Sequence, residues 1–382
     1  MPDFPPVRFL GSSFLGEVSL ADLDPHSAIP LERPGGEKTS FFPLLTYFHV
    51  IEQAIRKNEG EALLAALQTR LGRPVALSEI REIRIYSEKH GSDYHPAKIE
   101  ARFRDRVWSF VMNVALTERG RQVLTSEFQV LDELQRRGRL PYLPPAYFIE
   151  ETSADCGPAG RWPVQMYLAD WLEGFYEFHL SSDPADGKQK VVLWDAAGPN
   201  HFFPPSTADQ IYREIARILT SYYDWPTFSQ IHPWHLAAGD FIARIEADRA
   251  EVRLVAARQY GPLIGPPDLP PEEALLFFLL NMTIRIRLDR LNGVGDLAWA
   301  DERCLKPALE GFFLALGEKE QTGGLPREFV AYFRNYLESM AVEEIKTYLA
   351  ALRDSFDQCA PDLPLIKMHW EQHLNQFLSL TR

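Results

Sequence analysis

Residues 231–244 read IHPWHLAAGDFIAR, and the chemistry of this stretch decides how the rest of the chain is interpreted. It brings two histidines, His232 and His235, close to a carboxylate, Asp240. A neutral histidine can act as a general base near pH 7, and a carboxylate can bind a cation or cap the adjoining turn. The alternative for His232 and His235 is structural, with hydrogen bonds from both side chains to the backbone holding the loop in shape.

The stretch resembles a phosphotransferase catalytic loop. In the aminoglycoside phosphotransferase and choline kinase branch of the protein-kinase-like superfamily this loop reads roughly H-G-D-L-H-P-G-N-F, and residues 234–241, WHLAAGDF, align with its G-D-L-H-P-G-N-F portion. The resemblance implies that His235 stands at the position of the catalytic Asp and Asp240 at that of the metal-binding Asn. His235 and Asp240 are therefore the candidate catalytic residues, and Asp240 is also the candidate metal ligand.

The residues before this loop alternate as strands do. Residues 82–86 and 97–103 place apolar side chains at every second position, and 107–116 is a more continuous apolar run, so the pattern predicts three strands. Residues 121–137 have apolar side chains at helical spacing, and strand character resumes over 164–172. Three strands, a helix and further strands is the element order of a kinase-like N-terminal lobe.

Helices dominate the residues after this lobe. Thr207 with Gln210 predicts a capping box at the start of a helix that runs to about residue 222. A hairpin is expected over 241–256, and 271–382 reads as a series of amphipathic or buried helices. This is the composition expected of a kinase-like C-terminal lobe.

The N-terminal residues carry no chemical motif. Residues 30–43, PLERPGGEKTSFFP, read as a loop because prolines and glycines disfavour regular structure. Two helices are predicted after it, at 44–57 and 61–71, divided at Asn58-Glu59-Gly60.

We therefore predict an α+β protein with a bilobal protein-kinase-like fold, in which a small antiparallel-sheet N-lobe precedes a larger, mainly helical C-lobe. The expected parts are an N-terminal helical extension (1–78), the N-lobe (79–172) and the C-lobe (173–382). Residues 166–174, MYLADWLEG, resemble the hinge that joins the lobes in this superfamily.

The chain departs from the kinase pattern where ATP should bind. Phosphoryl transfer depends on positioning and on neutralising phosphate charge. The phosphate-binding lysine belongs on the third strand, where Asn113 aligns, and no lysine occurs from 99 to 187. Lys98 is a possible substitute, and Glu127 matches the glutamate that usually pairs with the lysine. Lys98, Asn113 and Glu127 are the candidate nucleotide-binding residues.

The expected metal and phosphate sites are also altered. Ala256 occupies the position of the second metal ligand, and Arg258 adds positive charge nearby, whereas magnesium requires oxygen ligands. The expected phosphate loop, 89–96, has one glycine and an acidic residue and is poorly suited to a triphosphate, so an ordinary hairpin turn built on Gly91-Ser92-Asp93 is the preferred interpretation. We therefore expect weak or absent Mg-ATP binding.

The preferred function is accordingly that of a degenerate kinase-like protein, catalytically silent toward ATP, which binds or regulates an unknown protein or small-molecule partner. One alternative is an atypical small-molecule phosphotransferase that uses His235 and Asp240. Another is a histidine-rich metal enzyme, although the spacing of its ligands matches no helix-borne motif such as H-E-x-x-H. The candidate ligands of that site are His179, His201, His232, His235 and Asp240.

Composition restricts the partners. A formal net charge of −13 disfavours nucleic-acid and anionic-membrane binding, since both require a basic surface. The three cysteines form no close pair, which fits a reducing cytoplasm. The first residues lack the basic and apolar regions of a signal peptide, and the most apolar helix, 274–284, is too short to span a bilayer. We expect a soluble cytoplasmic protein.

Overall fold

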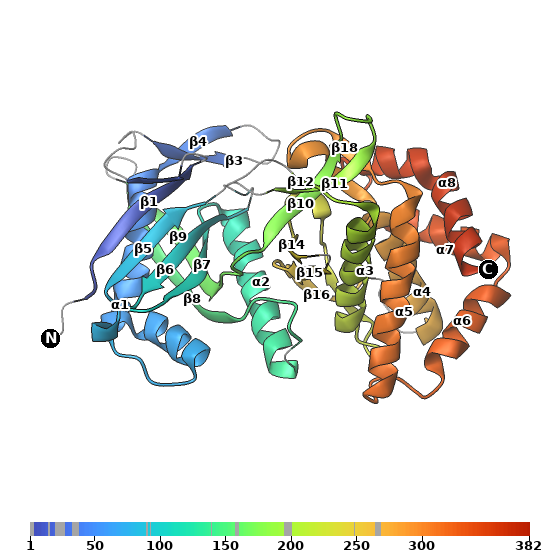
Figure 1. Ribbon diagram of the computed structural model, residues 1–382, viewed down its shortest axis with the longest axis horizontal. Helices are drawn as coiled ribbons and strands as arrows, with labels where there is room; N and C mark the ends of the chain where they lie inside the picture. The colour runs from blue at the N-terminus through green and yellow to red at the C-terminus, as the bar shows by residue number, and fades with distance from the viewer. Residues whose placement is uncertain are drawn as a thin grey trace. The chain divides into compact units, whose positions relative to one another are not determined.

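The computed structural model gives an α+β protein whose chain divides into two compact units, residues 1–173 (unit 1) and 174–382 (unit 2). Strands and helices occur in both units (Figure 1). The structure describes residues 4–13, 16–19, 27–32, 38–88, 91, 93–138, 140–156, 160–194, 201–247, 249–263 and 269–382.

Unit 1 is built on a seven-stranded sheet with the order β2-β1-β5-β6-β7-β9-β8. All neighbouring strands are antiparallel except β1 and β5, which are parallel. The alternating and continuous apolar patterns therefore predicted β5, β6, β7 and β9 correctly. The strands are β1 (Val7–Ser13), β2 (Gly16–Ser19), β5 (Glu82–Ser87), β6 (His95–Arg102), β7 (Val107–Ala115), β8 (Ala146–Asp155) and β9 (Arg161–Asp170).

Two helices cover opposite faces of this sheet. α1 (Leu44–Leu71) shares one hydrophobic core with the face that carries Ile99 and Met112. α2 (Glu118–Arg137) packs on the other face, where Phe128 contacts Tyr167 with ring centroids 5.9 Å apart. The two faces differ because neighbouring side chains along a strand point in opposite directions.

The predicted break in α1 is confirmed. Asn58, Glu59 and Gly60 all have positive φ angles, so the helical backbone conformation is interrupted there by a kink. A Cβ atom on Gly60 would lie 3.0 Å from the ring of Phe4, so both the backbone conformation and the packing favour glycine. The short helix η2 (Leu77–Glu79) then leads into β5.

The loop expected over 30–43 is wrong in part. β3 (Ala28–Glu32) and β4 (Lys38–Pro43) pair as an antiparallel hairpin. Ile29 and Phe42 face each other across it and are fully buried, so hydrophobic burial outweighs the local effect of the prolines and glycines. Most of those residues belong to 33–37, which lie outside the described part of the chain.

Unit 2 begins with strands where helix was expected. Its five-stranded sheet has the order β12-β11-β10-β14-β15, and β13 pairs with β16 and β17 with β18. The predicted hairpin is confirmed as β14 and β15, which pair antiparallel. The strands are β10 (Tyr176–Ser182), β11 (Gln189–Trp194), β12 (His201–Phe202), β13 (Ser229–His232), β14 (Phe241–Glu246), β15 (Arg249–Leu254), β16 (Gln259–Pro262), β17 (Leu288–Arg290) and β18 (Leu297–Trp299).

Helices make up the rest of unit 2, as predicted for its C-terminal part. α4 is buried along almost its whole length. No helix among the described residues has both the length and the hydrophobicity needed to cross a membrane. The helices are α3 (Pro205–Tyr222), α4 (Pro271–Arg285), α5 (Leu305–Gln321), α6 (Phe329–Ser339), α7 (Val342–Ser355) and α8 (Leu363–Thr381), with short helical turns η4 (Leu236–Ala238), η5 (Leu291–Gly293) and η6 (Glu302–Cys304).

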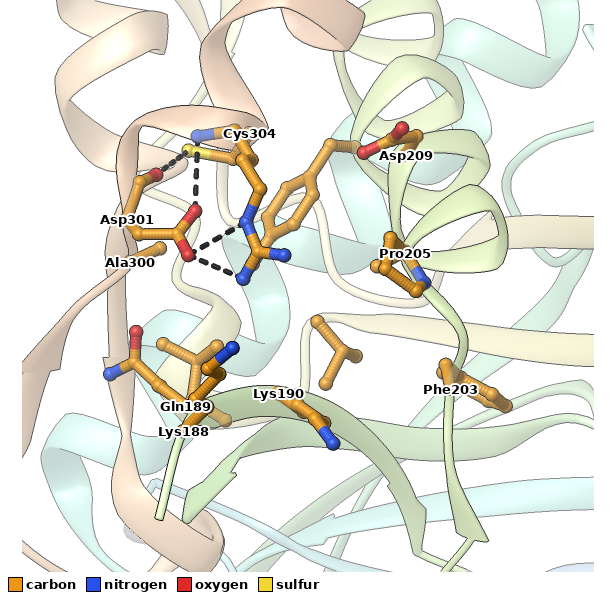
Figure 2. Close-up of a pocket in the computed structure, with 14 residues that line it drawn as sticks. Lys188, Gln189, Lys190, Phe203, Pro205, Asp209, Ala300, Asp301 and Cys304 are labelled. Carbon is orange, nitrogen blue, oxygen red and sulfur yellow. Dashed lines mark hydrogen bonds and ion pairs between the residues drawn. The ribbon is translucent and has the colours of Figure 1, made fainter. Parts of the chain in front are cut away.

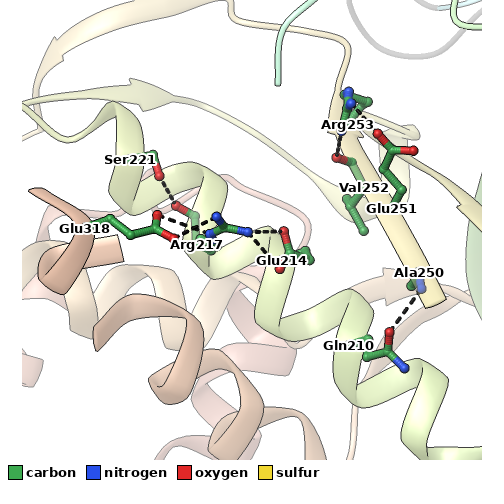
Figure 3. Close-up of polar contacts among 9 residues, drawn as sticks. All are labelled: Gln210, Glu214, Arg217, Ser221, Ala250, Glu251, Val252, Arg253 and Glu318. Carbon is green, nitrogen blue, oxygen red and sulfur yellow. Dashed lines mark hydrogen bonds and ion pairs between the residues drawn. The ribbon is translucent and has the colours of Figure 1, made fainter. Parts of the chain in front are cut away.

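Polar contacts fix α3 against its neighbours (Figure 3). Arg217 donates to Glu318 of α5 at 2.7 Å. Gln210 accepts a hydrogen bond from the backbone nitrogen of Ala250 in β15 at 3.0 Å. The capping box predicted from Thr207 and Gln210 is therefore wrong, because the helix begins earlier and the Gln210 side chain bonds to β15 instead.

Candidate functional site

The histidine loop, residues 232–240, connects β13 to β14 through the turn η4. Gly239 ends this turn with a φ angle of 69°, in the left-handed region. A Cβ atom at this position would lie 2.6 Å from Cδ of Glu177 on β10. The glycine therefore permits both the turn and the close approach of β10.

Asp240 is the residue that holds the loop together. It is 2% exposed, and its Oδ2 accepts a hydrogen bond from the backbone nitrogen of His235 at 2.8 Å. Arg258 binds both carboxylate oxygens, with Nη1 2.6 Å from Oδ2 and Nη2 2.7 Å from Oδ1. Such a two-point pair is the strongest geometry that a guanidinium and a carboxylate can form. Asp240 is thus a neutralised, structural carboxylate in this conformation.

The two histidines of the loop do not make the hydrogen bonds that we expected. Among the described residues, neither imidazole has a hydrogen-bond partner, and the backbone nitrogen of His235 is what binds Asp240. Burial lowers the pKa of both rings; at His235, Arg285 and Arg258 add to this effect and Asp240 opposes it. Both rings are therefore neutral at pH 7, and the His235 ring is half-buried beside the carboxylate that fixes its backbone.

Among the described residues, no second metal ligand accompanies Asp240. Ala256 and Ala257 follow β15 and are buried, and alanine supplies no side-chain oxygen. Among the residues that the structure describes, no group of three or more histidine, cysteine, aspartate or glutamate side chains is placed to hold a metal ion. The side chain of His201, one of the alternative histidine ligands, lies outside that description.

His179 belongs to a different cluster, which the sequence did not reveal. Its Nδ1 lies 2.9 Å from Oδ1 of Asp289, and its Nε2 lies 3.5 Å from Oε2 of Glu177. Burial alone would lower the pKa of His179, but the hydrogen bonds to both carboxylates outweigh burial and raise the pKa to about 9. The i, i+2 spacing of Glu177 and His179 placed them on one strand face, whereas the approach of Asp289 depends on tertiary structure.

In unit 1, Lys98 and Asn113 lie on the same face of the sheet. Pro96 on β6 pairs with Asn113 on β7, and Lys98 pairs with Val111. Because residues two apart on a strand point to the same side, Lys98 and Asn113 share a face on neighbouring strands. The Lys98 ammonium is bound elsewhere, 3.3 Å from Glu100 and 2.9 Å from Glu173. Lys98 therefore belongs to a partly buried ion-pair cluster with Glu100 and Glu173, and among the described residues it forms no ion pair with Glu127.

Glu127 is fully buried on α2, which packs against β7, β8 and β9. Asn113 on β7 is 7% exposed and uncharged. The structure thus places a buried carboxylate and a buried amide on the same side of the sheet, and the lysine on that face, Lys98, is paired with Glu100 and Glu173 instead. Of the expected phosphate loop between β5 and β6, residues 89, 90 and 92 lie outside the described residues.

The acidic residue of the hinge-like segment has a structural role. Asp170 is 5% exposed, accepts a hydrogen bond from the Tyr147 hydroxyl at 2.6 Å and pairs with Arg70 of α1. Burial raises the pKa of Asp170, and the hydrogen bond and the guanidinium act against it. The contact therefore ties α1 to the end of β9.

Comparison with known proteins assigns no family. No protein-family model matches the chain, and no curated protein matches it significantly.

Proposed function

We propose that the chain is a degenerate kinase-like protein, silent toward ATP, that acts as a binding or regulatory module. In this proposal residues 79–172 are the N-lobe and residues 173–382 the C-lobe of a bilobal kinase-like fold, and residues 1–78 are an N-terminal extension. The order of elements supports it, since three strands, a helix and two strands (β5 to β9) are followed, after β10–β12, by α3, β13, the histidine loop and the β14–β15 hairpin. The pairing of these elements within each unit is also consistent with that fold.

The observation that carries the proposal is the ion pair between Asp240 and Arg258. Under the proposed alignment Asp240 stands at a magnesium-binding position, yet both its oxygens are bound by one guanidinium. A magnesium ion would have to displace Arg258 and leave its charge unpaired beside the loop. Displacing one member of a buried pair costs about 3–5 kcal/mol, and Ala256 offers the ion nothing in return. Magnesium binding at this position is therefore disfavoured both by the Arg258 pair and by the lack of an oxygen ligand at Ala256.

The nucleotide side leads to the same conclusion from different residues. Phosphate binding by a kinase-like N-lobe needs a lysine held by a glutamate. Asn113 cannot supply the charge, and Lys98 is already paired with Glu100 and Glu173. The missing metal ligand lies in unit 2 and the missing phosphate-binding lysine in unit 1, so misaligning one segment with the kinase pattern would not explain both.

Thermal unfolding with ATP and magnesium tests the proposal. A ligand at about 100 times its dissociation constant would add about 2.7 kcal/mol of stability, so we expect the wild-type midpoint to stay nearly fixed in millimolar Mg-ATP. A magnesium-dependent rise of the wild-type midpoint would overturn the silent assignment.

A variant that restores the metal ligands tests the kinase-like assignment of the loop separately from the predicted lack of ATP binding. Ala256→Asp combined with Arg258→Gln frees Asp240 and returns a carboxylate to the second metal position. We expect this double variant to gain a midpoint shift with Mg²⁺ or Mn²⁺, while Arg258→Gln alone gains less. A double variant that folds but responds to neither ion would contradict the kinase-like assignment of the loop.

One observation favours the atypical phosphotransferase as a second candidate. The His235 imidazole is neutral and has no hydrogen-bond partner among the described residues, so it remains available as a base. Phosphoryl transfer from ATP by wild-type protein, lost on His235→Ala, would establish this candidate in place of the first.

A further inference from the structure

A small pocket between β11, α3 and η6 is lined by charged residues that interact with one another (Figure 2). Its volume is about 70 Å³. Lys190 pairs with Asp183 at 2.6 Å, and Arg303 pairs with Asp301 at 2.6 Å. Asp209 lies in the field of Arg303. This pocket therefore presents little unbalanced charge to a ligand.

A larger pocket, the three-helix groove, lies between α5, α6 and α8. Its volume is about 310 Å³, at the lower end of the range of about 300 to 1,000 Å³ that is usual for small-molecule sites. Each helix gives it apolar surface: Leu309 and Phe313 from α5, Leu337 from α6 and Leu380 from α8. Because Leu380 is 41% exposed, a ligand can reach this surface from outside. No residue of the histidine loop lines the groove.

Three cationic side chains surround the three-helix groove. Lys306, Arg334 and Arg382 line it, and none of them forms an ion pair with a residue that the structure describes. Two acidic side chains also line it, but Glu310 is already bound by an arginine of α3 at 3.1 Å. Only Glu338 remains to oppose the three cations. The side chains of the groove thus carry excess positive charge, although the formal net charge of the chain is −13.

Two of the three cations are held in place by contacts that leave N–H donors for a ligand. The guanidinium of Arg334 lies over the Phe313 ring, 3.6 Å from its centroid, and such stacking uses the face of the guanidinium and not its N–H groups. Nη2 of Arg382 donates to the backbone oxygen of Met340 at 3.0 Å. A guanidinium has five N–H donors, so both residues keep donors for an anion. Because these side chains are already positioned, binding an anion orders them less than it would order free side chains.

We propose that the three-helix groove binds a medium-chain fatty acid. The alkyl chain covers Leu309, Leu337 and Leu380, and the carboxylate binds Arg334 and Lys306. An uncharged alkyl chain would leave the cations without a partner, and a small anion such as phosphate would leave the apolar surface exposed to water. A ligand with one alkyl chain and one carboxylate satisfies both parts of the groove. The inference is independent of the proposed function, since it uses none of the candidate catalytic or nucleotide-binding residues.

Calorimetric titration of the full chain at pH 7 tests the proposal with octanoate, octanol, octylamine and acetate. We expect octanoate to bind with a dissociation constant below about 1 mM, and the other three probes to bind at least about tenfold more weakly. Octanol cannot use the cations, octylamine is repelled by them, and acetate lacks the alkyl chain. Absence of octanoate binding at about 5 mM would overturn the proposal, and so would octanol binding as tightly as octanoate.

Charge variants of opposite sign assign the carboxylate to the groove. Arg334→Gln should weaken octanoate binding about tenfold, whereas Glu338→Gln should strengthen it, and neither should change octanol binding. Both positions are exposed and lack an ion pair with a described residue, so both variants should fold. Arg327→Gln is the matched control, because Arg327 is exposed between α5 and α6 but does not line the groove. Octanoate binding by Arg334→Gln that equals the wild type would refute the assignment.

A second pair of variants tests the apolar part of the groove. Leu380→Gln should weaken octanoate and octanol binding by the same factor, since it changes the surface that the alkyl chain covers. Leu314→Gln is the control, because Leu314 of α5 has a similar exposure of 45% and lies outside the lining. Equal losses in the two variants would mean that octanoate adsorbs on apolar surface in general, and would overturn the proposal.

Discussion

Replacing Arg258 with methionine should destabilise unit 2 more than its surface position suggests. The change keeps the apolar stem and removes the guanidinium, so Asp240 stays 2% exposed with only the hydrogen bond from the His235 backbone. Removing one member of a buried pair costs about 3–5 kcal/mol. Because the Arg258 side chain is 20% exposed, water can reach part of the site, and we expect the lower end, about 3 kcal/mol.

A double-mutant cycle separates the ion pair from other effects of the change. The cycle comprises wild type, Arg258→Met, Asp240→Asn and the double variant, each measured by urea unfolding at pH 7 with the m-value held as a check on the unfolded state. We expect Asp240→Asn to cost about 2 kcal/mol, since the amide oxygen can still accept from His235. The double variant should cost less than the sum by about 1.5–3 kcal/mol.

Additive costs would refute the reasoning, because they would mean that Asp240 and Arg258 do not stabilise each other. A cost below about 1 kcal/mol for Arg258→Met would do the same, since that is the value of an ordinary surface ion pair.

Three further predictions follow from particular contacts. The pKa of His179 is about 9 in the folded protein, against 6.5 for an unshifted histidine. The protonated ring therefore stabilises the fold fully below pH 6.5, and this contribution is lost as the pH rises to about 9. Urea unfolding across this range should show the loss in the wild type and not in His179→Gln. Gly311→Ala should lower the melting temperature because its Cβ would lie 2.0 Å from the Arg213 carbonyl oxygen, whereas Gly317→Ala in the same helix, with nothing within 4 Å, should raise stability by up to about 1 kcal/mol. His235→Ala should cost only about 1 kcal/mol, since no hydrogen bond of its ring is lost, and a loss of 2 kcal/mol or more in unfolding measurements would reveal a contact beyond those described.

Local sequence patterns predicted the elements that carry their own periodicity. β5 and β6 alternate between apolar and polar residues, and β7 is a nearly continuous apolar run. The break of α1 includes Asn58 and Gly60, two residue types that accept positive φ. β3 and β4 were missed because their composition favours turns, and only the burial of Ile29 against Phe42 reveals them. Short-range signals were sufficient where the burial pattern lay within one element.

The candidate site was less predictable because its contacts join distant residues. The presence of Arg258 could be read as unfavourable to magnesium, but its two-point pair with Asp240 spans 18 residues and two strands. The cluster of His179 and Asp289 spans 110 residues. No sequence periodicity indicates either contact. The sequence therefore identified candidate residues by type but could not predict which residues they contact.

The parallel pairing of β1 with β5 has a practical consequence for handling this protein. Residues 7–11 of β1 pair with residues 83–87 of β5 and so cover one edge of β5, although β1 precedes β5 by more than 70 residues in the sequence. If β1 were cut away or pulled out by a bulky fusion, that edge would present unpaired amides and carbonyls to a second molecule. Exposed edges of this kind template intermolecular strand exchange and aggregation. An affinity tag is therefore better carried after α8 than ahead of β1.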